Sequence, residues 1–261
     1  MQKVDYALRY INYLLHSKTK FGIHSPFLFN LVNEVLYDKT EYPAYKSIEN
    51  LKKSLLRSTE IIEVTDLGAG SKTIKSNRRP VSKIAKTSSK PKKYGRLMFR
   101  LARHLKPLHI LELGTSLGFS SAYMAFGQPQ SKLTTIEGCP NISAIAAQNF
   151  RQLNLQNITL LNGNFDEILP RWIGQNEFPT LIFIDGNHRK EPTIRYFEQC
   201  VSKAVKGTCL VFDDIHWSAE MEQAWEHIKY SNSVNLSVDL FFMGLVFIND
   251  DLSKEDFQIR F

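Results

Sequence analysis

Short apolar runs alternate with amphipathic stretches from about residue 108 to residue 249. The runs of strand length are 108–113, 132–137, 157–162, 179–185, 207–213, 234–240 and 244–249. The stretches with helical spacing are 118–127, 140–154, 165–173, 191–205 and 217–230. This alternation is typical of a parallel sheet with helices on both faces. A short link joins the last two runs and requires antiparallel pairing. The pattern therefore predicts an α/β fold with a seven-stranded, mostly parallel sheet and an antiparallel last strand.

The first hundred residues carry helical patterns and then a strongly basic stretch. The helical patterns are 6–16, 26–37 and 45–57. Residues 67–111 contain thirteen Lys and Arg and no acid, so the formal net charge of +7 is concentrated there. We expect two parts: an N-terminal helical extension with a basic loop, 1–93, and the α/β domain, 94–261.

Composition excludes several classes of protein. No apolar run approaches the roughly 20 residues that a membrane span needs, and the N-terminus lacks the apolar core of a signal peptide. The three cysteines show no metal-ligand spacing. These features predict a cytoplasmic protein without a membrane span, and they leave the oligomeric state open.

The run Leu108–Gly118 resembles a cofactor-binding turn, because a buried strand leads into a glycine loop that opens a helix. Its glycines, Gly114 and Gly118, are spaced G-x-x-x-G. This spacing differs from the G-x-G-x-x-G fingerprint of NAD-binding folds, so NAD is disfavoured as the cofactor. The second strand ends in Glu137, where an open α/β sheet holds a ribose by its hydroxyls. An ordinary βαβ turn is the alternative. A second glycine-rich stretch, 66–71, is not followed by a strand that ends in an acid, so we do not expect it to bind the cofactor.

Acidic residues also follow the fourth and fifth predicted strands. Asp185 ends the fourth strand and is followed by His188, and Asp213 and Asp214 end the fifth. Like charges at neighbouring strand ends are costly unless a cation joins them, which favours a hard divalent metal. The alternative is that these acids cap the helices that follow.

Residues 94–249 resemble the Rossmann-like class I S-adenosylmethionine methyltransferases, and the strand-end acids are similar to those of the metal-dependent O-methyltransferases of the catechol and caffeoyl-CoA type. Two positions depart from that type: Asp214 replaces an Asn, and His188 replaces a Lys. Both departures match the metal-dependent O-methyltransferases of macrolide sugars.

The resemblance implies a function and a set of site residues. It implies methyl transfer from S-adenosylmethionine to a hydroxyl of a small molecule, either a sugar or other aliphatic alcohol, or a catechol. Asp185, Asp213 and Asp214 would hold Mg²⁺, and His188 would act as general base beside Asp185. The implied cofactor residues are Glu112, Gly114, Thr115, Ser116, Gly118, Glu137, Asn164, Phe165 and Asp185.

The basic segment 72–106 leaves further hypotheses open. It could be a lid that closes over an anionic acceptor, an RNA-binding arm, or a solvated loop followed by a basic helix face. An RNA methyltransferase is therefore one alternative, although the Asn-Pro-Pro-aromatic and Pro-Cys motifs of such enzymes are missing. A non-catalytic protein that binds S-adenosylmethionine is another.

Overall fold

The computed structural model describes residues 2–65, 77–88 and 91–261. They fall into two compact units. Unit 1 combines the residues up to Tyr37 with Ile173–Phe261, and unit 2 is Asp38–Trp172. The expected division into 1–93 and 94–261 stays a prediction.

Unit 2 contains three parallel strands of the main sheet in the order β3-β4-β5. They are β3 (His109–Leu113), β4 (Lys132–Glu137) and β5 (Ile158–Asn162), and the helices that follow them are α6 (Phe119–Gly127), α7 (Pro140–Gln152) and α8 (Phe165–Gln175). Both faces of β3 are buried, as its mostly apolar sequence predicts, and the buried positions include Glu112. The register pairs Leu113 with Ile136, so the carboxyl ends of β3 and β4 lie next to each other.

Three helices and a hairpin precede these strands in the described part of unit 2. In unit 2 these are α3 (Pro43–Leu55), β1 (Ile61–Glu63), β2 (Arg78–Pro80), α4 (Val81–Thr87) and α5 (Lys92–Leu105). The strands β1 and β2 pair in antiparallel fashion. The sequence pattern did not predict β1, β2 or α4, because each is short and because β2 and α4 lie in the basic stretch 67–111, where apolar residues are few.

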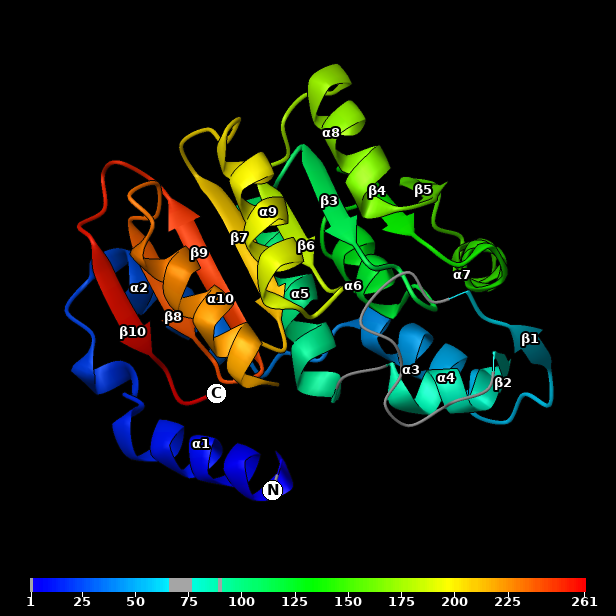
Figure 1. Cartoon of the computed structure of the whole chain (residues 1–261), viewed down its shortest axis with the longest axis horizontal. Coiled ribbons are helices and arrows are strands. Elements are labelled where there is room, and N and C mark those ends of the chain that lie inside the picture. Colours follow the sequence, from blue (N-terminus) through cyan, green and yellow to red (C-terminus); the bar gives the residue numbers. More distant parts are fainter. Residues whose placement is uncertain (1, 66–76, 89–90) are drawn as a thin grey trace. The chain divides into compact units, whose positions relative to one another are not determined.

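Unit 1 contains the other five strands of the main sheet in the order β10-β8-β9-β7-β6. They are β6 (Leu181–Ile184), β7 (Thr208–Asp213), β8 (Leu236–Asp239), β9 (Met243–Ile248) and β10 (Glu255–Gln258). Strand β9 is antiparallel to both β7 and β8. The helices α9 (Lys190–Val201) and α10 (Ala219–Tyr230) lie side by side in front of β6, β7 and β9 (Figure 1).

The expected strand count was one too low. The described residues place eight strands in the main sheet, and the last of them, β10, pairs in parallel with β8. The antiparallel strand β9 is therefore not the last one. Phe257 of β10 and Ile259, just after it, are buried, and their alternation with polar residues is too short to be distinctive in the sequence.

The N-terminal helices of unit 1 are α1 (Gln2–His16), the single turn η1 (Lys20–Gly22), α2 (Pro26–Leu31) and the π-helical turn η2 (Val32–Leu36). Ser25 caps α2 by accepting a hydrogen bond from the Leu28 amide. The Tyr6, Tyr10 and Tyr13 rings of α1 all contact the Phe241 ring. These aromatic contacts attach α1 to the rest of unit 1.

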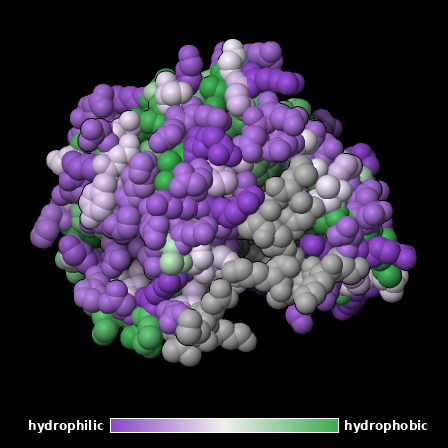
Figure 2. Space-filling model, in the orientation of Figure 1, coloured by the Kyte–Doolittle hydropathy of each residue, from purple (hydrophilic) through white to green (hydrophobic). Residues whose placement is uncertain are grey.

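Hydrophilic residues cover most of the face shown in Figure 2. Among the residues with a described structure, no helix combines the length and the apolar character that crossing a membrane requires. Cys139, Cys200 and Cys209 are all buried, reduced thiols.

Candidate functional site

The glycine loop after β3 requires unusual backbone angles. Gly114, Ser116 and Gly118 have φ values of 104°, 47° and 82°. A Cβ atom added to Gly118 would lie 2.4 Å from the Phe150 ring, so a side chain at this position would meet both steric and conformational strain. Such left-handed residues are concentrated at ligand sites, which agrees with the predicted role of this loop.

Glu137 at the end of β4 is held by backbone amides on two sides. Its Oε2 accepts a hydrogen bond from the Ser116 amide at 2.8 Å, and its Oε1 accepts one from the Cys139 amide at 2.9 Å. The carboxylate therefore joins the glycine loop to the first turn of α7. The structure thus brings together Glu137 and Ser116, two of the residues predicted to bind the cofactor.

Glu112 lies under the glycine loop and is completely buried. Its Oε2 accepts hydrogen bonds from the hydroxyls of Ser121 and Thr135, the latter at 2.6 Å. The Thr135 hydroxyl also contacts the Thr115 hydroxyl at 2.6 Å. Burial raises the pKa of Glu112 to about 7, against the lowering effect of the neighbouring hydroxyls. Through Thr135, the buried side chains of Glu112 and Thr115 are therefore linked to each other and support the glycine loop. The sequence alone did not indicate these contacts.

Asn164 begins α8. Its Oδ1 accepts a hydrogen bond from the Asp166 amide at 3.0 Å, as in an Asx turn, and Phe165 beside it is half-buried. The predicted contacts of Asn164 and Phe165 with adenine stay predictions.

In unit 1, Asp185 and His188 follow β6 and form a pair. The His188 Nε2 lies 3.5 Å from the Asp185 Oδ1, and both side chains are partly exposed. Asn187 between them has a φ of 62°. Its amide group donates a hydrogen bond to the Tyr196 hydroxyl, and its Oδ1 accepts one from the Arg189 Nε. Asn187 is thus engaged in shaping the turn, while His188 faces the carboxylate.

Asp213 and Asp214 follow the neighbouring strand β7. The register pairs Ile184 with Phe212, so Asp185 and Asp213 emerge from adjacent strand ends, as expected. Asp213 is buried, and Asp214 has a φ of 54°. The Asp214 amide donates a hydrogen bond to the Phe242 carbonyl at 2.7 Å, which holds this turn against the β8–β9 link.

The fit of these acids to a metal ion is incomplete. Three carboxylates are the donors that a hard divalent cation such as Mg²⁺ prefers. In the part of the chain that the structure describes, however, no three His, Cys, Asp or Glu side chains are gathered closely enough to hold a metal. The chemistry of the donor set fits Mg²⁺, but the side-chain positions do not form a metal centre.

His216, two residues after Asp214, belongs to a network that sequence reasoning missed. Its Nε2 lies 2.8 Å from the Asp239 Oδ2, and its Nδ1 lies 3.0 Å from the Glu222 Oε1. Burial lowers the pKa of His216, but the hydrogen bonds with Asp239 and then Glu222 outweigh it, so the pKa is raised. The Arg9 Nε of α1 lies 3.2 Å from Glu222. The only sequence signal was the acid at the end of β8, Asp239.

The basic residues of α5 are largely used within unit 2. Arg96 forms ion pairs with Glu41 and Glu49, and the Lys92 Nζ also lies 2.5 Å from Glu49. Arg100 donates a hydrogen bond to the Asp38 carbonyl, at 2.5 Å. The basic face expected for this helix is therefore partly neutralised by acids from the preceding segment.

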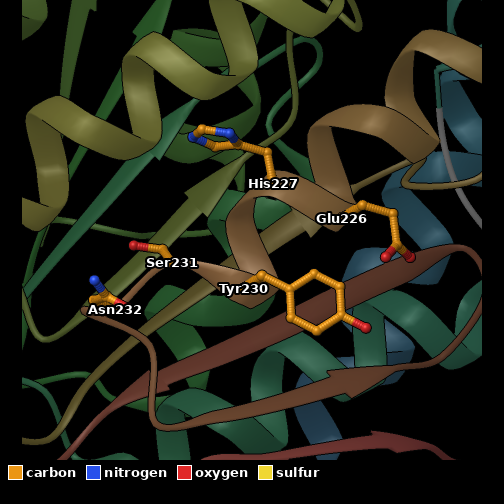
Figure 3. Close-up of a pocket in the computed structure, with 5 residues that line it drawn as sticks. All are labelled: Glu226, His227, Tyr230, Ser231 and Asn232. Atoms are coloured by element: carbon orange, nitrogen blue, oxygen red, sulfur yellow. The ribbon is translucent and has the colours of Figure 1, made fainter.

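A shallow pocket lies at the C-terminal end of α10 (Figure 3). Its volume is about 600 Å³, and it is lined by Glu226, His227, Tyr230, Ser231 and Asn232. None of the predicted site residues with a described position lines this pocket.

Comparison with known proteins identifies the family. A family model described as a methyltransferase domain matches residues 111–215, which include the glycine loop, Glu137, Asp185, Asp213 and Asp214. The catechol O-methyltransferase of Sus scrofa is 30% identical over 129 residues, which are 48% of this chain and 69% of that protein. The chain belongs to the class I S-adenosylmethionine-dependent O-methyltransferases.

Two further likenesses are to a bacterial relative and to a solved structure. The catechol O-methyltransferase of Niastella koreensis is 32% identical over 124 residues, which are 46% of this chain and 55% of that protein. The SAH-bound methyltransferase of Podospora anserina shares the fold with a TM-score of 0.61 at 13% identity, over 87% of this chain and 98% of that one. The chain spans about half the length of the bacterial catechol O-methyltransferases that it matches. The predicted α/β class and the resemblance to methyltransferases are confirmed.

Proposed function

We propose that this chain transfers a methyl group from S-adenosylmethionine to a hydroxyl of a small-molecule acceptor. The observation that carries the proposal is the pairing of a left-handed glycine loop with Glu137, whose carboxylate is held in place by the Ser116 and Cys139 amides. A carboxylate fixed at this strand end is suited to accept hydrogen bonds from ribose hydroxyls. Family membership supports the same reaction.

The proton of the acceptor hydroxyl has to leave for methyl transfer to proceed. His188 is the proposed general base, because an imidazole can accept a proton near neutral pH. Asp185, 3.5 Å from the His188 Nε2, would orient the ring and stabilise its protonated form. Together they are proposed to make the acceptor oxygen nucleophilic enough to attack the sulfonium methyl.

Magnesium is a further part of the proposal, supported by the chemistry of the donor set. Asp185, Asp213 and Asp214 would hold the ion, which when bound would lower the pKa of an acceptor hydroxyl. The proton transfer proposed above needs only His188 and Asp185. Metal dependence is therefore a separate question from methyl transfer, and it can be measured separately.

The acceptor class is proposed in two forms. The relatives named catechol O-methyltransferases support a catechol-like acceptor. The His188 and Asp214 positions support a sugar or another aliphatic hydroxyl, because they match the sugar-modifying branch of the family. A screen that compares simple catechols with sugars of similar size, with and without a phosphate group, would separate these forms and test the anionic alternative.

Calorimetric titration with S-adenosylmethionine tests the central proposal. We expect the wild type to bind, Glu137→Ala to bind at least about tenfold more weakly through loss of two charge-assisted hydrogen bonds to ribose, and the exposed-site control Glu255→Gln to match the wild type. Unchanged affinity in Glu137→Ala would remove the ribose assignment. No binding to the wild type would refute the proposed function.

Titration of Mg²⁺ into the cofactor-loaded protein tests the metal. We expect binding in the wild type and its loss in Asp213→Ala, with cofactor affinity retained. If the cofactor binds but Mg²⁺ does not, the carboxylates are caps or direct partners of the base, and RNA becomes the next acceptor to assay. We also propose a cytoplasmic location, which agrees with the three reduced cysteines.

A further inference from the structure

The hairpin β1–β2 and helix α4 pack directly onto the segments that carry the proposed cofactor residues, all within unit 2. A cluster of buried side chains joins the two sets of elements. From the hairpin and α4 come Val64, Val81, Ile84 and Ala85, and from the glycine loop and α7 come Leu117, Cys139, Ile142 and Ile145. Leu117 lies between Ser116 and Gly118, so this cluster reaches the glycine loop itself.

Hydrogen bonds fix the same contact at the edge of β1. The Thr65 amide donates to the Cys139 Sγ at 3.3 Å, and the Cys139 thiol donates to the Glu63 carbonyl at 3.8 Å. The Asn141 side-chain amide donates to the same Glu63 carbonyl at 2.8 Å. Residues 139 and 141, separated from β1 by more than seventy residues, are thus held by its backbone.

These contacts continue to Glu137. The Cys139 amide donates to the Glu137 Oε1, and the Ser116 amide donates to the Glu137 Oε2. A displacement of Cys139 would therefore move one of the two amides that hold the carboxylate. Leu117, which directly follows Ser116, belongs to the same buried cluster. The cluster therefore also restrains the Ser116 amide.

We propose that β1, β2 and α4 form a clamp that holds Ser116–Leu117 and Glu137–Cys139 in the geometry for binding S-adenosylmethionine, with Cys139 and Asn141 as positioning residues. This inference rests on the proposed function of the glycine loop and Glu137. Its physical basis is preorganisation: a site that is already ordered loses less conformational freedom when the ligand binds. The clamp therefore acts on cofactor affinity and leaves the methyl-transfer step unaffected.

Four variants test the clamp by calorimetric titration with S-adenosylmethionine. Cys139→Ala removes the thiol contacts with Glu63 and Thr65, and Asn141→Ala removes the side-chain hydrogen bond from an exposed position where folding is tolerant. We expect each to raise the dissociation constant about fivefold, the effect of one lost hydrogen bond. Cys139→Ser keeps a donor and an acceptor, and we expect it to stay within about twofold of the wild type.

Cys200→Ala is the matched control, because Cys200 is a buried cysteine in α9 of unit 1. We expect it to lower the urea midpoint of unfolding but to leave cofactor affinity unchanged. In a steady-state assay, Asn141→Ala should raise KM for S-adenosylmethionine without changing kcat. Wild-type affinity in both Cys139→Ala and Asn141→Ala would overturn the clamp, as would an equal loss of affinity in Cys200→Ala. Failure of the wild type to bind the cofactor would instead refute the proposed function.

Discussion

Replacing Glu112 by glutamine should remove a pH dependence from the stability of the fold. Glu112 is completely buried beneath the glycine loop, and burial raises its pKa from 4.5 to about 7. The hydroxyls of Ser121 and Thr135, which donate to its Oε2, oppose this rise but do not cancel it. The folded chain therefore binds the proton of Glu112 more tightly than the unfolded chain does.

The sign and size of the effect follow from this difference. A raised pKa in the folded state stabilises the fold fully below about pH 4.5, and this contribution is lost as the pH rises towards about 7. Each tenfold change in proton affinity corresponds to roughly 1.4 kcal/mol, so the contribution lost across this range is about 3 kcal/mol. Glutamine has a similar shape, keeps an acceptor for the two hydroxyls and does not titrate.

Urea unfolding of the wild type and Glu112→Gln between about pH 4.5 and about pH 8 measures the effect. We expect the free energy of unfolding of the variant to fall less with rising pH than that of the wild type, by about 3 kcal/mol over the range. Glu255→Gln, at an exposed position of β10, should keep the wild-type profile. Parallel profiles for Glu112→Gln and the wild type would refute the reasoning.

Other substitutions test the glycine loop, the proposed base and the hydrogen-bond network of His216. Gly118→Ala places a Cβ 2.4 Å from the Phe150 ring at a φ of 82°, so we expect it to lower the free energy of unfolding by about 2 kcal/mol or more in urea titrations. His188→Ala should lower kcat about 100-fold near neutral pH, with partial recovery at higher pH; an unchanged pH profile would exclude His188 as the base. His216→Ala removes the imidazole partner of the buried Asp239, which keeps hydrogen bonds from the Phe241 amide and Gln258, and should lower the urea midpoint. His227→Ala at an exposed position of α10 should not lower it.

The local features of the fold and of the candidate site could be predicted from the sequence because they depend on short-range order. The strand before Gly114, the helix after Gly118 and the acid at the end of β4 each follow from a pattern of about ten residues. The acids Asp185 and Asp213 could be expected at neighbouring strand ends, because parallel strands of one sheet present their carboxyl ends at one edge.

Only the tertiary structure decided which distant groups meet. Asp239 and Glu222 reach His216 from separate elements, and the Glu63 carbonyl meets Asn141 across 78 positions in the chain. Short elements such as β1, β2 and β10 are stabilised by pairing and burial, which periodicity does not encode. The sequence by itself determined the order of strands and turns and the residue types at their ends. Packing between distant segments determined which of those side chains are buried, paired or held in place, because burial and pairing depend on neighbours that lie far away in the chain.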